Sequence, residues 1–135
     1  MSLTDAQRAR LALFAKVMIP GGSGMPSAAD LTLWAASVDE VLAIDPSRFE
    51  PMAQFLALDA PVENLADIEA LAQVDKTGFE ALGVVLASAY FMHSKTRQSI
   101  GYPGQEARDS SGGLTEEDEA LLEPVIARGP IYRPA

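Results

Sequence analysis

Residues 76–105, KTGFEALGVVLASAYFMHSKTRQSIGYPGQ, contain the most apolar segment of the chain and, directly after it, its most sharply defined turn. From Lys76 to Met92, apolar side chains recur at helical spacing on nearly every face, which predicts a central helix covered by neighbours on several sides. Residues 100–104 then combine two glycines, which tolerate positive φ, with a proline that fixes φ. We therefore expect a rigid turn after the central helix that presents Tyr102.

Length and composition indicate one ordinary domain. At 135 residues, about two-thirds of the extended-chain surface can be buried, which is enough for a core. The formal net charge of −9 argues against binding to nucleic acids or anionic membranes, because such binding needs clustered Lys and Arg. No cysteine is present, which excludes disulfides, thiolate metal sites and a cysteine nucleophile.

Four further helices are predicted before the central one. The first begins at a Thr4 cap, with Gln7 completing a capping box, and ends before Pro20. The others run over about residues 27–43, from Asp45 onward with Pro46 in the first turn, and over about residues 65–74. No segment alternates as a strand would, so we predict an all-α fold, a compact bundle of about five helices over residues 1–105.

Residues 106–135 change in character and are predicted to form a polar linker, a short acidic helix and an extended tail. Thr115 is the expected helix cap, and an acidic first turn suits the helix dipole. One apolar stripe follows, interrupted by Pro124, and consists of Leu121, Leu122, Val125 and Ile126. The tail either wraps its own core or lies along another protein; we favour a partner contact through Ile131, Tyr132 and Arg133, whose residue types are common at interfaces.

The chain is poor in residues for catalysis. His93 is the only histidine, it precedes Lys95 and Arg97, and a cation near a helix C-terminus is the ordinary explanation for it. The glycine-rich residues 21–26 lack the strand and the Gly-Lys-Ser/Thr step of a phosphate loop, so we interpret them as a linker turn. Trp34 is interpreted as a core or interface anchor. We predict no catalytic, cofactor-binding or metal-binding residue in this chain.

Two segments carry a resemblance to a known family. Residues 13–20, LFAKVMIP, are similar to its first helix, which ends in an Ile-Pro or Leu-Pro step. The more specific match is an aromatic pair followed after a few polar residues by Ile-Gly-Tyr-Pro-Gly, here Tyr90, Phe91, Ile100, Gly101, Tyr102, Pro103 and Gly104. With these features the chain resembles the gluconate 2-dehydrogenase subunit 3 family, the small non-catalytic subunits of flavin-dependent sugar and alcohol dehydrogenases.

The resemblance implies a hetero-oligomer in which a large GMC-type flavoprotein carries FAD and the catalytic histidine. The small subunit would bind that partner, stabilise it and assist its maturation in a chaperone-like manner. The substrate, a sugar, glycoside or alcohol, would be bound by the partner. The expected interface residues in this chain are Tyr90, Ile100, Gly101, Tyr102, Pro103 and Gly104, together with the tail residues Ile131, Tyr132 and Arg133.

Other interpretations remain open at this point. The chain could be a stand-alone helical interaction or regulatory protein without an enzyme partner, or a small enzyme that uses His93 and nearby carboxylates. Its start lacks an export signal, and residues 81–92 are too short to cross a bilayer, which needs about 20 apolar residues. We therefore expect a cytoplasmic protein without direct membrane insertion, and periplasmic export together with the partner is the alternative.

Overall fold

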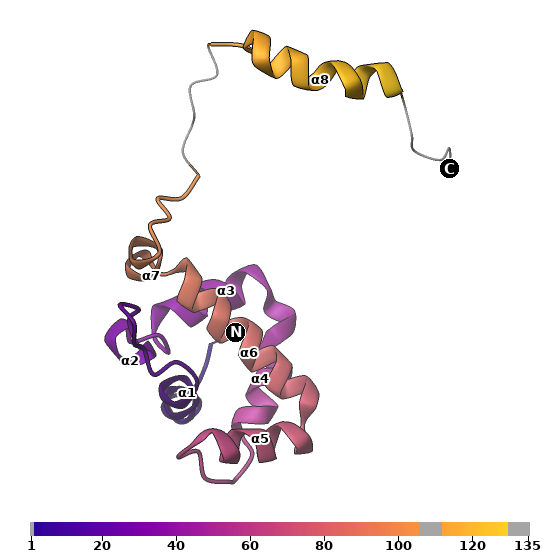
Figure 1. Ribbon diagram of the computed structural model, residues 1–135. Coiled ribbons are helices and arrows are strands. Elements are labelled where there is room, and N and C mark those ends of the chain that lie inside the picture. The colour runs from indigo at the N-terminus through magenta and orange to yellow at the C-terminus, as the bar shows by residue number, and fades with distance from the viewer. Residues whose placement is uncertain (1, 106–111, 130–135) are drawn as a thin grey trace. The chain divides into compact units, whose positions relative to one another are not determined.

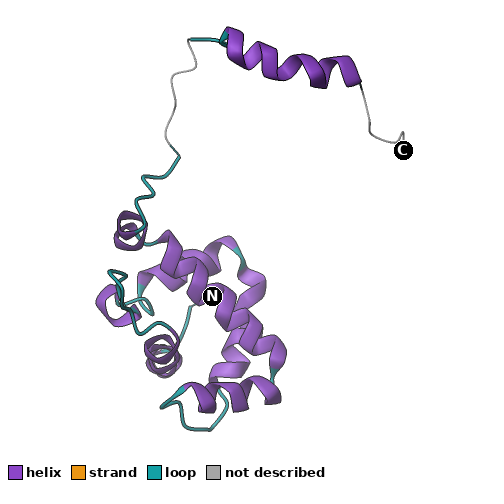
Figure 2. Ribbon diagram, viewed as in Figure 1, coloured by secondary structure: helices purple, strands orange, loops and turns teal. Residues whose placement is uncertain are grey.

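A computed structural model describes residues 2–105 and 112–129, and the chain divides into two units, Met1–Gly104 and Gln105–Ala135 (Figure 1). Every regular element in the described residues is helical, so the predicted all-α class is confirmed (Figure 2). The predicted number of about five helices over the first 105 residues is not confirmed. One predicted helix is divided in two, and a short helix forms where none was expected.

Helix α1 (Asp5–Met18) begins as predicted. The Thr4 hydroxyl accepts a hydrogen bond from the Gln7 backbone N–H at 3.2 Å, and the Gln7 side-chain oxygen accepts one from the Thr4 N–H at 2.9 Å. These two bonds form the capping box that satisfies otherwise unpaired donors of the first turn. The helix ends at Met18, with Ile19 as its C-cap before Pro20, and it buries Leu11, Ala12, Phe14 and Ala15.

The predicted helix over residues 27–43 is wrong in one respect, because it forms two helices, α2 (Ala28–Leu31) and α3 (Ala36–Ile44). Thr32 adopts a left-handed conformation with φ of 48° and ends α2. The break buries both Leu31 and Leu33, which are 7% and 0% exposed. Residues two positions apart point to different sides of a continuous helix, so the turn is needed to bring both side chains into one core.

The next two helical segments begin where the sequence indicates. The Asp45 carboxylate accepts a hydrogen bond from the Ser47 N–H and caps η1 (Pro46–Arg48), a 3-10 turn that leads into α4 (Phe49–Leu56). Helix α5 (Leu65–Val74) has the predicted bounds and is capped by Asn64. A row of tilted aromatic rings joins α1, α4 and α6 through Phe14, Phe55 and Phe79, with centroids 5.3 and 6.0 Å apart.

Helix α6 (Lys76–Met92) has the predicted bounds and contacts α3, α4 and α5 (Figure 1). Its buried face consists of Gly78, Ala81, Leu82, Val85, Leu86, Ala89 and Tyr90. Neighbours cover this helix on several sides, as predicted, and leave one side open. Val84 is 43% exposed and Phe91, seven residues later on the same side, is 55% exposed. One apolar face of the central helix is therefore accessible.

In the second unit, α8 (Glu116–Arg128) begins at Thr115 as predicted, with Asp118 completing a capping box. The helix continues through Pro124. The predicted partner contacts Ile131, Tyr132 and Arg133 lie outside the described residues. Within residues 2–105 and 112–129, no helix combines the length and apolar character needed to cross a membrane.

Candidate partner interface

The aromatic pair and the Ile-Gly-Tyr-Pro-Gly segment lie on either side of a short helix, α7 (Ser94–Ser99). At its start, the His93 side chain caps the helix, because Nδ1 accepts a hydrogen bond from the Lys95 N–H at 3.2 Å. In its middle, Thr96 is fully buried and anchors the helix to the core. At its end lies the turn over residues 100–104. This helix was not expected, since its sequence, SKTRQS, has no apolar periodicity.

The Ile-Gly-Tyr segment forms the C-terminal cap of α7. The Gly101 N–H donates to the Gln98 carbonyl at 3.1 Å, and the Tyr102 N–H donates to the Arg97 carbonyl at 2.8 Å. These two bonds define a Schellman motif, in which the residue after the helix takes a left-handed conformation. Gly101 has φ of 69°, and a Cβ atom there would meet nothing within 4 Å. The conformation, rather than lack of space, therefore requires glycine at this position.

The same cap holds apolar side chains in solvent. Ile100 and Tyr102 are 51% and 49% exposed, and Phe91 and Met92 at the end of α6 are 55% and 41% exposed. The two pairs flank a helix of six residues, which is about 9 Å long. We call these four residues the α7 surface. Large apolar side chains held on a fixed backbone lose little entropy on binding, and aromatic residues dominate the energetics of many interfaces.

Tyr90 does not belong to this surface. Its side chain is 7% exposed, and its hydroxyl donates to the Pro26 carbonyl at 2.8 Å, which ties α6 to the loop before α2. The prediction that Tyr90 contacts a partner directly therefore does not fit its position. Phe91 is the exposed member of the aromatic pair, and its ring meets the Tyr90 ring edge-on with centroids 5.3 Å apart. The buried Tyr90 ring thus packs against the exposed Phe91 ring.

The loop that Tyr90 contacts is closed by its own backbone. Gly22 and Met25 exchange two backbone hydrogen bonds of 3.1 and 2.9 Å, and the Ala28 N–H donates to the Ile19 carbonyl at 3.0 Å. Together with α7 this loop lines an open groove of about 500 Å³, formed by Gly24, Met25, Pro26, Lys95, Gln98 and Ser99. Hydrogen bonds from Ser27, aided by the charge of Lys95, hold the pKa of the Asp30 carboxyl below its ordinary value. Its lining is mixed, with Met25 and Pro26 from the loop and Lys95, Gln98 and Ser99 from α7.

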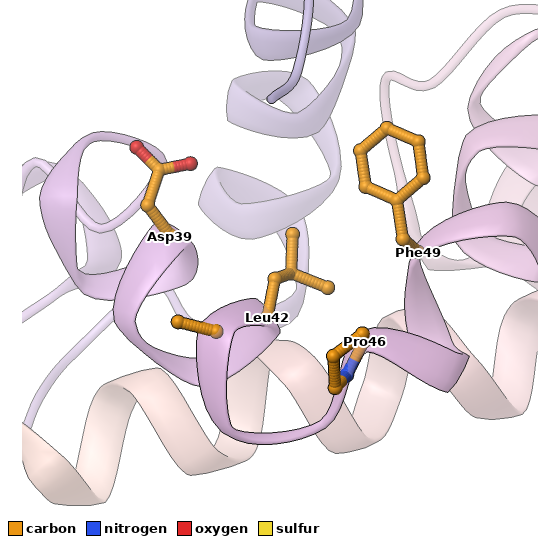
Figure 3. Close-up of a pocket in the computed structure, with 5 residues that line it drawn as sticks. Asp39, Leu42, Pro46 and Phe49 are labelled. Atoms are coloured by element: carbon orange, nitrogen blue, oxygen red, sulfur yellow. The ribbon is translucent and has the colours of Figure 1, made fainter. Parts of the chain in front are cut away.

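A second, smaller pocket lies between α3 and α4. It has a volume of about 240 Å³ and is lined by Asp39, Leu42, Ala43, Pro46 and Phe49. Figure 3 shows Asp39 and Phe49 on either side of Leu42. The Asp39 carboxylate accepts two hydrogen bonds from Arg8, at 2.8 and 2.9 Å, and Arg8 also donates to the Trp34 carbonyl at 3.0 Å. Asp39 therefore joins α1 to α3, and an arginine already neutralises its charge.

Trp34 and His93, the two residues singled out as candidate anchors or catalysts, have structural roles. The Trp34 ring is partly buried against the core, and the Lys16 ammonium lies 5.3 Å from its centroid. Such cation–π contacts help to hold an exposed ring edge in place. His93 Nδ1 is engaged in the cap of α7. In the described part of the chain, no group of three or more histidine or acidic side chains is placed to hold a metal ion.

A scan against protein-family models found no match, and searches of curated proteins and of solved structures found no similar protein.

Proposed function

We propose that this chain is the non-catalytic small subunit of a hetero-oligomer with a large FAD-dependent, GMC-type oxidoreductase that acts on a sugar, glycoside or alcohol. The chain binds the folded flavoprotein and stabilises it, and thereby assists its maturation. A protein that binds the native state and not the unfolded state shifts the folding equilibrium by mass action. FAD and the reacting groups belong to the large subunit. We propose the cytoplasm as the location, with joint export to the periplasm as the alternative.

One observation carries this proposal. The Ile100–Gly104 segment, which resembles the family signature, is a rigid helix cap that keeps Ile100 and Tyr102 about half exposed. The chain's own fold does not use these side chains, because neither is part of the buried core. A turn that is fixed by backbone hydrogen bonds and carries exposed apolar side chains is well suited to binding another protein. The same feature would also serve a stand-alone interaction protein, so the identity of the partner rests on the resemblance.

Co-expression tests the proposal. The probe is a large GMC-type flavoprotein, produced with and without the chain. We expect co-purification of the two chains, and a several-fold higher yield of FAD-containing large subunit when both are present. Equal yield and equal thermal stability of the flavoprotein in both cases would refute the stabilising role. Equal yield with lost turnover would instead indicate a catalytic contribution from this chain, with His93 as the first residue to test.

A matched pair of variants locates the interface. Ile100→Ala combined with Tyr102→Ala removes two members of the α7 surface. The control is Ile44→Ala at the end of α3, where the isoleucine is 72% exposed and lies outside the proposed interface. We expect the double variant to lose the complex and the control to retain it. If both bind equally well, the interface lies elsewhere.

A further inference from the structure

Helix α8 carries an apolar stripe that the fold of its own unit does not cover. The stripe consists of Leu121, Leu122, Val125 and Ile126, which are 71%, 41%, 54% and 75% exposed. Their spacing places them within about 140° of the helix circumference. The described residues of this unit, 105 and 112–129, contain no second helix or strand that could pack on them. An exposed apolar face of four large side chains is typical of an interaction surface.

The length and sequence of α8 lead to the same conclusion. Isolated helices of 12–15 residues or fewer are marginal in water, and α8 has 13 residues. Pro124 within it also lacks the N–H that would continue the hydrogen-bond ladder. The capping box at Thr115 and Asp118 favours the first turn, but most helix stability in proteins comes from packing of an apolar face. We expect α8 to become fully helical when its stripe is covered.

Charges beside the stripe identify the chemistry of the partner. Glu116, Glu119 and Glu123 follow one another along one edge of the helix, and with Leu114, Leu122 and Ile126 they line a groove of about 650 Å³. A surface with apolar side chains beside carboxylates is suited to binding Lys and Arg side chains. Their aliphatic stems can cover the apolar atoms while their charged ends reach the carboxylates. The opposite edge carries Glu117 and Arg128, whose charges cancel.

We propose that α8 docks into an apolar groove of the large flavoprotein, with a row of Lys or Arg residues of that groove facing Glu116, Glu119 and Glu123. This inference rests on the proposed function and assigns it a second contact, separate in sequence from the α7 surface. A second copy of α8 is a poor occupant, because it would bring like carboxylates together. An anionic membrane surface would repel the same acidic edge.

The test uses the full-length chain and the flavoprotein of the co-expression experiment. Binding is measured by calorimetry at low and high salt for the wild type and three variants. Leu122→Asp places a charge in the stripe and should weaken binding roughly tenfold or more. Glu119→Lys should weaken it several-fold and reduce its salt dependence. The control is Glu117→Lys, which makes the same charge change in the same helical turn on the other edge and should bind like the wild type.

Each outcome decides between the two proposals. If the wild-type chain forms no complex, both the proposed function and this inference are refuted. If the wild type binds and Leu122→Asp binds equally well, this inference alone is refuted. Equal effects of the two lysine variants would show that the partner surface facing Glu119 is not basic, which also overturns this inference. If Leu122→Asp lowers the thermal stability of the free chain, the stripe is already covered within the chain or by a second copy. That result would also overturn this inference.

Discussion

Two glycines of α6, five residues apart, should respond in opposite ways to the same substitution. A Cβ atom added at Gly78 would lie 2.6 Å from the Phe55 Cβ and 2.9 Å from the Pro51 carbonyl oxygen. Both are parts of α4 that cannot rotate away, so α4 and α6 would have to separate. A Cβ atom added at Gly83 would meet nothing within 4 Å. Gly78 therefore allows close helix packing, whereas Gly83 has no such packing role.

The expected magnitudes follow from these distances. Overpacking of a core typically lowers the free energy of unfolding by about 1–3 kcal/mol. The new methyl group at Gly78 would also displace the Asp75 carboxylate, which caps α6 by accepting the Gly78 N–H at 2.9 Å, and loss of a cap costs about 1 kcal/mol. Alanine returns about 0.5–1 kcal/mol of helix propensity at either site. We expect Gly78→Ala to destabilise the chain by about 2 kcal/mol and Gly83→Ala to stabilise it by about 0.5–1 kcal/mol.

Urea unfolding of the full-length chain, followed by circular dichroism, measures both changes. A slope of about 1–3 kcal/mol per molar urea converts the expected difference into a shift of roughly 1 M or more between the two midpoints. The slopes should stay equal, since neither variant changes the surface exposed on unfolding. Coincident midpoints, or a more stable Gly78→Ala variant, would refute the close α4–α6 packing on which this reasoning depends.

Three further outcomes are expected. Tyr102→Ala should weaken the complex with the flavoprotein by about 1–3 kcal/mol without moving the urea midpoint of the free chain, because the ring lies outside the core. Tyr90→Phe should lower the free energy of unfolding by about 1 kcal/mol, since the part-buried Pro26 carbonyl loses its donor; an unchanged urea midpoint would contradict this. The side-chain and backbone hydrogen bonds of Thr115 lower the pKa of the Asp118 carboxyl. Its contribution to α8 is therefore present above the unfolded pKa of about 3.9 and is lost as the pH falls through the lower folded value. Amide shifts of residues 116–119 should report that loss, and constant shifts down to pH 2 would contradict it.

Helices whose signals are local could be predicted from the sequence. The bounds 65–74 and 76–92 agree with α5 and α6, because each begins at a residue whose side chain caps it and carries regular apolar spacing. The division between α2 and α3 could not be predicted in the same way. It depends on the burial of Leu33 in a core built by residues far along the chain, and this burial outweighs the helix propensity of the segment around Thr32.

In the candidate interface, the turn could be predicted from the sequence, but the helix before it could not. The glycines and the proline of residues 100–104 indicate a turn, and both glycines do have positive φ. The helix that this turn caps was missed, since its signals lie at its two ends and not in its periodicity. His93 provides the first cap, Gly101 provides the last, and buried Thr96 supplies the one anchor between them. A glycine two residues before a proline, after a run of polar helix formers, is the sequence signal for such a cap.

The difference between Tyr90 and Phe91 shows where sequence reasoning about an interface stops. Both are aromatic, they are adjacent, and both match the same family feature, so the sequence alone does not show which of them is exposed. On a helix, neighbours in sequence point about 100° apart, so one ring enters the core while the other faces solvent. Only the packing of α6 against the loop that ends in Pro26 decides which is which. Phe91→Ala should therefore act on partner binding and Tyr90→Ala on folding, and a comparison of the two would separate an interface effect from a loss of the native chain.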